Sequence, residues 1–253
     1  MTTPDPHTGA IPLSDSDATA LLRDLLAKGT AAAPNALFVF DLDSTLLDNR
    51  PRQALIMREY GEQHGVEALA TATADVWKGW SAKVAMINAG LDEAQLDQHF
   101  EPFRAYWRDC FFTSQYCKHD WPIIGAPEYA RAALETGARV AYVTGRHEAM
   151  RAGTVESFHE PAFPIPDGER VQLVMKPNLD ETDDAYKERT YDMLRKLGAL
   201  VAAFDNEPTH INGYRAAFTD ATAVHLATDH SLREVKVADG VVSIRNFAPF
   251  LSA

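Results

Sequence analysis

The chain has few cysteines, no excess of basic residues and no long apolar run. Its 253 residues include only two cysteines, Cys110 and Cys117, and their spacing fits no common zinc site, so we expect two reduced thiols. Lysine and arginine number 24 against 36 acidic residues, a formal charge of −12, which disfavours a long nucleic acid as partner. No stretch resembles a membrane-spanning helix, and residues 1–12 lack the basic start and apolar run of a signal peptide. These absences favour a cytoplasmic protein that does not bind membranes.

An apolar segment that ends abruptly in acids is the most informative part of the chain. Residues Ala36 to Phe40 are all apolar and are followed directly by Asp41-Leu42-Asp43-Ser44-Thr45. The run is typical of a buried parallel strand, and chemistry in open α/β sheets takes place beyond the carboxyl ends of the strands. Side chains two positions apart share one face, so Asp41 and Asp43 can reach the same substrate group. A simple turn after a core strand is the alternative explanation.

Two further apolar runs end in polar residues in the same way. Arg139 to Val143 stops at Thr144-Gly145-Arg146, and Leu200 to Phe204 stops at Asp205. Between them, the segment from Tyr186 to Leu197 has the spacing of an amphipathic helix, ends at Gly198 and carries Lys187 near its start. The pattern predicts parallel strands whose ends bring acids, a hydroxyl and a lysine together.

With these residues in this order, the chain resembles the haloacid dehalogenase-like superfamily of hydrolases and phosphatases. Asp41-Leu42-Asp43-Ser44-Thr45 matches the first of the family's four motifs, Thr144 the second, Lys187 the third and Asp205 the fourth. The match frames residues from about 36 to 207. The resemblance implies an α/β fold, with a three-layer Rossmann-like core around a parallel sheet and an all-helical cap domain.

The helical pattern between the first and second motifs gives the expected domain boundaries. Residues 1–48 and 120–253 are predicted to form the core and residues 49–119 the cap, with helices over Glu67 to Asn88 and Asp92 to Phe112. Asp120-Trp121-Pro122 is expected to be the return linker. We interpret the many aromatic residues of the cap mainly as its hydrophobic core, with one or two available to touch substrate.

The resemblance also assigns chemical roles. It implies that Asp41 is the nucleophile that forms an aspartyl-phosphate, and that Asp43 is the acid and base, which requires a carboxyl shifted toward protonation. Lys187 neutralises charge, with Lys176 as the alternative lysine. The expected catalytic residues are Asp41, Asp43, Thr144 and Lys187, and the expected substrate-binding residues are Thr45, Thr144, Gly145 and Arg146.

Hard oxygen ligands and an expected phosphate suit Mg²⁺ as cofactor. In the family pattern Asp41 and Asp205 supply side-chain oxygens and Asp43 its backbone carbonyl. The chain departs from relatives with a second acid in the fourth motif, because Asn206 stands there, and the direction of Glu207 is open.

The sequence therefore predicts a Mg²⁺-dependent phosphatase that hydrolyses a small phosphorylated metabolite. The second acid, Asp43, favours a phosphate ester over a haloacid. A phosphotransferase with the same chemistry, and a catalytically idle protein that binds a phosphorylated ligand, are the alternatives. Neither the substrate nor the oligomeric state follows from the sequence.

Overall fold

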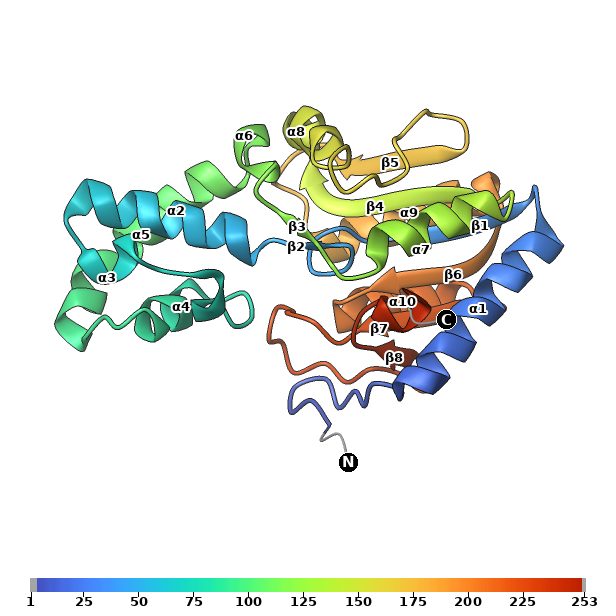
Figure 1. Cartoon of the computed structure of the whole chain (residues 1–253), viewed down its shortest axis with the longest axis horizontal. Coiled ribbons are helices and arrows are strands. Elements are labelled where there is room, and N and C mark those ends of the chain that lie inside the picture. The colour runs from blue at the N-terminus through green and yellow to red at the C-terminus, as the bar shows by residue number, and fades with distance from the viewer. Residues whose placement is uncertain (1–3, 252–253) are drawn as a thin grey trace.

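A computed structural model describes residues 4–251; residues 1–3 and 252–253, which the predicted core range includes, lie outside the described residues. Its centre is a six-stranded parallel sheet with the strand order β5-β4-β1-β6-β7-β8 (Figure 1). The strands are β1 (Ala36–Phe40), β4 (Arg139–His147), β5 (Val171–Lys176), β6 (Ala199–Asp205), β7 (Thr222–Leu226) and β8 (Val242–Ile244). All five residues of β1 are buried, as its unbroken apolar run predicts.

Helices cover both faces of this sheet. On one face, Phe38 and Phe40 of β1 pack in a cluster with α1 (Asp15–Ala32) and α7 (Ala126–Glu135). On the other face, Leu37 and Val39 pack in a second cluster with α9 (Asp183–Leu197) and α10 (Pro208–Ala217). The alternation follows from the two-residue period of a strand. The predicted three-layer α/β core is confirmed.

Short elements complete the core. They are the 3₁₀ turn η2 (Glu148–Met150), α8 (Arg151–Glu156) and α11 (Ala248–Leu251). Ser14 caps α1 by accepting a hydrogen bond from the backbone N–H of Asp17. Within residues 4–251, every helix is too short or too polar to cross a membrane.

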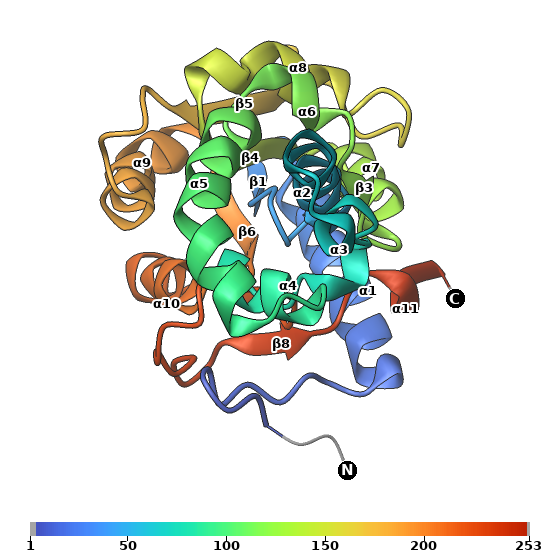
Figure 2. The same cartoon turned by 90° about the vertical axis from the view of Figure 1, so that its left-hand side faces the viewer.

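The segment between the first two core strands is almost wholly helical and lies to one side of the sheet (Figures 1 and 2). We call it the helical region: α2 (Arg50–His64), α3 (Glu67–Ala70), the 3₁₀ turn η1 (Ala74–Val76), α4 (Ala82–Asn88), α5 (Glu93–Phe111) and α6 (Ser114–Cys117). It has its own hydrophobic cluster, which includes Ile56, Trp77 and Phe103. The domain boundaries at residues 49 and 119, and the role of this region as a cap, remain predictions.

One expectation about this region is wrong. The run Glu67 to Asn88 is not one helix but α3, η1 and α4, because residues 71–73 and 77–81 leave the helical conformation and Gly79 has a positive φ of 67°. The segment expected to be the return linker contains a short strand, β3 (Trp121–Pro122), which pairs antiparallel with β2 (Leu47–Asp48).

Candidate active site

The ends of three neighbouring strands bring the motif residues together. β1 lies between β4 and β6, and their carboxyl ends share one edge of the sheet because all three run parallel. Asp41 directly follows β1, Thr144 lies in the last part of β4, and Asp205 ends β6. The backbone N–H of Asp41 donates to the carbonyl of Phe204, 2.9 Å away, which fixes the two acidic strand ends side by side.

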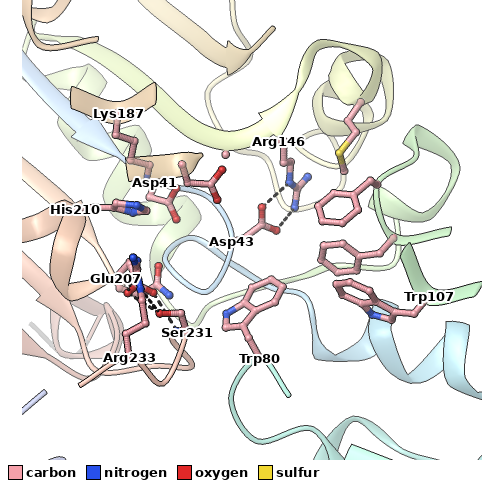
Figure 3. A pocket seen from close by; sticks show the side chains of 16 residues that line it. Asp41, Asp43, Trp80, Trp107, Arg146, Lys187, Glu207, His210, Ser231 and Arg233 are labelled. Carbon is pink, nitrogen blue, oxygen red and sulfur yellow. Dashed lines mark hydrogen bonds and ion pairs between the residues drawn. The ribbon is translucent and has the colours of Figure 1, made fainter. Parts of the chain in front are cut away.

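Lys187 joins the two carboxylates. Its Nζ lies 2.7 Å from Oδ1 of Asp41 and 2.5 Å from Oδ2 of Asp205, and its side chain is only 2% exposed. Helix α9 points Lys187 at the strand ends from its second turn, after a start at the N-cap Thr182. Lys176 instead contacts Asp183, 2.6 Å away. The structure thus places Lys187, and not the alternative Lys176, against Asp41 (Figure 3).

One ammonium does not offset the negative charge gathered here. Burial raises the pKa of Asp41, and although Lys187 lowers it, Asp205 raises it again. Burial also acts on Asp205, but Lys187 and then His210 hold the pKa of that carboxyl well below its usual range. The Lys187 pKa is raised well above normal by the two carboxylates, although burial opposes this. We therefore describe Lys187 and Asp205 as the ion pair, and Asp41 as a carboxyl group whose negative charge would not be fully compensated.

Asp43 is held by arginines rather than prepared for protonation. Arg146 donates from Nε and Nη2 to its two oxygens at 2.9 and 2.7 Å, and Arg52 donates from Nη2 at 3.1 Å. Burial raises the pKa of Asp43, but the two guanidinium groups outweigh it and the net pKa is lowered. The expectation that the neighbours of Asp43 shift it toward protonation is wrong for this conformation.

A fourth residue, Asp120, completes a buried ion-pair network. It lies 2.9 Å from Nε of Arg52 and 2.5 Å from Nη2 of Arg146, and its side chain and that of Arg52 are 0% exposed. The contact to Arg52 is an ion pair without hydrogen-bond geometry. The network ties α2 and the return segment to β4. Sequence reasoning missed Arg52 and Asp120, since neither lies in a motif and only the fold brings them together.

The other motif residues organise the loops around the strand ends. Oγ1 of Thr45 lies 3.2 Å from Oδ2 of Asp41 and accepts a hydrogen bond from the backbone N–H of Asn206 at 3.1 Å. The Asn206 side chain lies 3.0 Å from Thr45 and donates to the carbonyl of Asp229. The carboxylate of Glu207 accepts hydrogen bonds from the side chains of Ser231 and Arg233, which lie 2.8 and 3.0 Å from its Oε1 atom. Asn206 and Glu207 thus hold the loop after β7.

The second motif lies in extended backbone. Thr144 is fully buried in β4, and its Oγ1 accepts a hydrogen bond from the backbone N–H of Arg146 at 3.2 Å. A Cβ on Gly145 would come within 2.6 Å of a carboxylate oxygen of Asp183. Only glycine fits this approach without displacing that side chain.

A cavity of about 260 Å³ opens above these residues. Asp41, Asp43, Arg146 and Lys187 line its inner end (Figure 3). Four aromatic residues of the helical region line the opposite side, and we call them the aromatic wall: Trp80, Trp107, Phe111 and Phe112. Trp77 and Phe103 belong to the hydrophobic core of that region, as expected, but more aromatic side chains face the cavity than the sequence suggested.

Comparison with known proteins shows the fold. No family model and no curated protein matches the chain. A predicted phosphoglycolate phosphatase from Haemophilus somnus 129PT is 18% identical over 85% of this chain and 96% of its own, with a TM-score of 0.53. CbbY from Rhodobacter sphaeroides, solved with phosphate, is 14% identical over 84% of this chain and 94% of its own, with a TM-score of 0.50. At these identities the likeness concerns the fold.

Proposed function

We propose that this chain, which has the fold of the haloacid dehalogenase-like hydrolases, is a Mg²⁺-dependent phosphatase acting on a small phosphomonoester. One observation carries the proposal. Asp41 and Asp205 lie at the ends of adjacent parallel strands and share the buried Lys187, and Asp41 and Lys187 line a cavity together with Asp43. Two carboxylates and a lysine at one strand edge are the parts needed to transfer a phosphoryl group.

The chain's own residues account for the covalent steps. Oδ1 of Asp41 accepts a hydrogen bond from Lys187 at 2.7 Å, whereas Oδ2 has only the longer contact with the Thr45 hydroxyl at 3.2 Å, so we assign Oδ2 as the oxygen that attacks phosphorus. The bond from phosphorus to the leaving oxygen breaks as the aspartyl-phosphate forms. Water then attacks phosphorus, which releases phosphate and restores the Asp41 carboxylate. Lys187, which lines the cavity, stabilises charge on the transferring group. Thr144 is fully buried and does not line the cavity, so its role in binding the phosphoryl group stays a prediction.

Asp43 has to change partners before it can act as an acid. Its carboxylate is bound by Arg146 and Arg52, and a carboxylate in such contacts is a poor proton donor. Protonation of the leaving oxygen therefore requires Asp43 to take up a proton and to give up part of these contacts. Once the leaving group has departed, the ionised Asp43 is suited to accept a proton from the attacking water.

The site suits a magnesium ion in the kind of ligands it offers. Side-chain oxygens of Asp41 and Asp205 and the backbone carbonyl of Asp43 would hold the ion, which would neutralise charge on the phosphoryl oxygens. In the described part of the chain, residues 4–251, no three or more His, Cys, Asp or Glu side chains are grouped so that they could hold a metal ion. This is compatible with a magnesium site, because Mg²⁺ takes only one or two carboxylates from protein. Burial is the largest cause of the raised pKa of Asp41, and a cation bound beside it would lower that pKa.

Hydrolysis of an aryl phosphate by the purified protein tests the proposal. We expect phosphate release that requires Mg²⁺, stops with a chelator, and falls at least about a thousandfold in Asp41→Asn because the nucleophile is lost. Asp24→Asn is the matched control, since Asp24 is 55% exposed on α1. Hydroxylamine should trap an acyl phosphate in the wild type only.

Three outcomes contradict the proposal. Full activity in Asp41→Asn would exclude this nucleophile. Release of the alcohol without phosphate in the presence of glycerol would indicate a phosphotransferase. No turnover of any phosphomonoester by the wild type would leave only ligand binding.

A further inference from the structure

The aromatic wall forms one continuous apolar surface across the cavity from Asp41. Trp107 and Phe111 of α5 stack with their ring centroids 4.6 Å apart, and Phe112 packs edge-on against Phe111 at 5.2 Å. Trp80, from the loop before α4, meets Phe111 at 5.6 Å with the ring planes at 88°. Figure 3 shows the two tryptophans on the side of the cavity opposite Lys187.

The wall offers contact area rather than hydrogen bonds. Phe111 is nearly buried, whereas Trp80, Trp107 and Phe112 are partly exposed. The Nε1 atom of Trp107 is buried without a hydrogen-bond partner. Such a surface gains free energy by covering an apolar group, and flat rings gain more by stacking.

The cations that line the cavity are already engaged. Arg146, Lys187 and Arg233 are the lysine and arginine side chains lining it among residues 4–251, and each contacts two carboxylates. Asp183 and Glu207 add negative charge to the cavity lining. A second phosphate or a carboxylate on the substrate would therefore meet no uncompensated positive charge.

The cavity is also small. Its volume of about 260 Å³ lies just below the range of about 300–1,000 Å³ typical of ligand pockets. There is room for a phosphoryl group at the Asp41 end and for one modest ring beyond it, but not for a long chain or a dinucleotide.

We propose that the substrate is the monophosphate of a small alcohol or phenol that carries an aromatic ring and no second anionic group. This rests on the phosphatase function proposed above and names its substrate class. The phosphoryl group meets Asp41, and the ring of the leaving group packs on Trp80 and Trp107.

Benzyl phosphate and cyclohexylmethyl phosphate provide the test. Both are esters of primary alcohols of similar size and similar leaving-group acidity, so a difference in kcat/KM reports the flat ring rather than the chemistry. We expect benzyl phosphate to be preferred by about 3- to 10-fold, as aromatic pairs gain that much beyond the area they bury. Phosphoglycolate, with its extra carboxylate, should be poorer than benzyl phosphate.

Two variants locate the preference. Trp107→Leu and Trp80→Leu should each bring the ratio of the two kcat/KM values close to one while cyclohexylmethyl phosphate is still hydrolysed. Phe100→Leu is the control, because Phe100 lies on the same helix as Trp107 but does not line the cavity. Wild-type binding is a measurement independent of variant folding: benzylphosphonate should quench tryptophan fluorescence at lower concentration than cyclohexylmethylphosphonate.

The outcomes separate this inference from the function on which it rests. Turnover of both esters with a ratio near one in the wild type, or faster turnover of phosphoglycolate, overturns the substrate class and leaves the phosphatase intact. An unchanged benzyl preference in both tryptophan variants also overturns it. Failure to hydrolyse any phosphomonoester overturns the phosphatase proposal, and this inference with it.

Discussion

Replacing Asp120 by asparagine should destabilise the protein strongly although Asp120 is in no motif. Asp120 is the carboxylate shared by Arg52 and Arg146, and both of its oxygens lie within 2.9 Å of a guanidinium nitrogen. Asparagine keeps the volume but removes the charge, so two buried arginines are left with Asp43 alone. Breaking a buried ion pair from one side costs about 3–5 kcal/mol. We expect the low end, about 3 kcal/mol, because Asp43 still compensates part of the charge.

The measurement is urea or thermal unfolding of the variant beside the wild type. For a chain of this size about 3 kcal/mol corresponds to a fall in Tm of about 6–12 °C. Asp24→Asn is again the matched control: its ion pair with Lys28 is exposed, so its loss should cost less than about 1 kcal/mol. Because Arg52 and Asp120 are in contact, Arg52→Met combined with Asp120→Asn should cost less than the two single changes added.

A small effect would refute this reasoning in a specific way. The pKa of Asp120 is raised, because burial outweighs Arg52 and Arg146, which lower it. We take Asp120 to be charged because it contacts both guanidinium groups. If Asp120→Asn unfolds within about 1 kcal/mol of the wild type, the carboxyl is neutral, and the network is not an ion-pair network.

Two more predictions concern buried groups near the strand ends. Lys187→Met should abolish phosphate release, whereas Lys176→Met should retain most of it, because only Lys187 contacts Asp41; equal losses in steady-state assays would contradict this. His225 is buried and donates from Nε2 to the carbonyl of Asn206, and burial lowers its pKa to about 4. As the pH falls, His225 therefore takes up its proton in the unfolded state before it does so in the folded state. The free energy of unfolding should in consequence fall by about 2 kcal/mol between pH 7 and pH 5. Urea titrations at both pH values should show that His225→Gln lacks this component; an identical loss in the variant would refute it.

The sequence was sufficient for the centre of the site because its signals are local. Each of Asp41, Thr144 and Asp205 directly follows an apolar run at or near the end of its strand, and parallel strands bring such ends to one edge. Lys187 could be preferred over Lys176 because it lies near the start of an amphipathic helix that packs on the sheet. The relative positions of these four residues then follow from the order and direction of the strands and helices.

The surroundings of Asp43 could not be predicted in this way. Arg52, Asp120 and Arg146 are separated by 68 and 26 residues, and no periodicity links them; their contact depends on how the helical region meets the sheet. The same holds for the aromatic wall, since Trp77 and Trp80 have the same residue type and nearly the same position, yet one is in a hydrophobic core and the other at the cavity. The break of the Glu67–Asn88 run was visible only as Thr71, Thr73 and Gly79, which are weak signals when taken singly.

The pairing of β2 with β3 has a mechanical consequence. The chain leaves the sheet and returns to it through two strands that are bonded to each other, with Leu47 opposite Pro122 and Asp48 opposite Trp121, and Ile123 adds a backbone bond to Leu46. Sliding one strand along the other would break these bonds, while bending the ribbon as a unit preserves them. Outside this pair, Gly79 donates from its backbone N–H to Asp229, and Ser114 donates from its hydroxyl to the carbonyl of Ala149. Moving the aromatic wall away from the nucleophile would therefore have to break contacts with the core in addition to bending the paired strands.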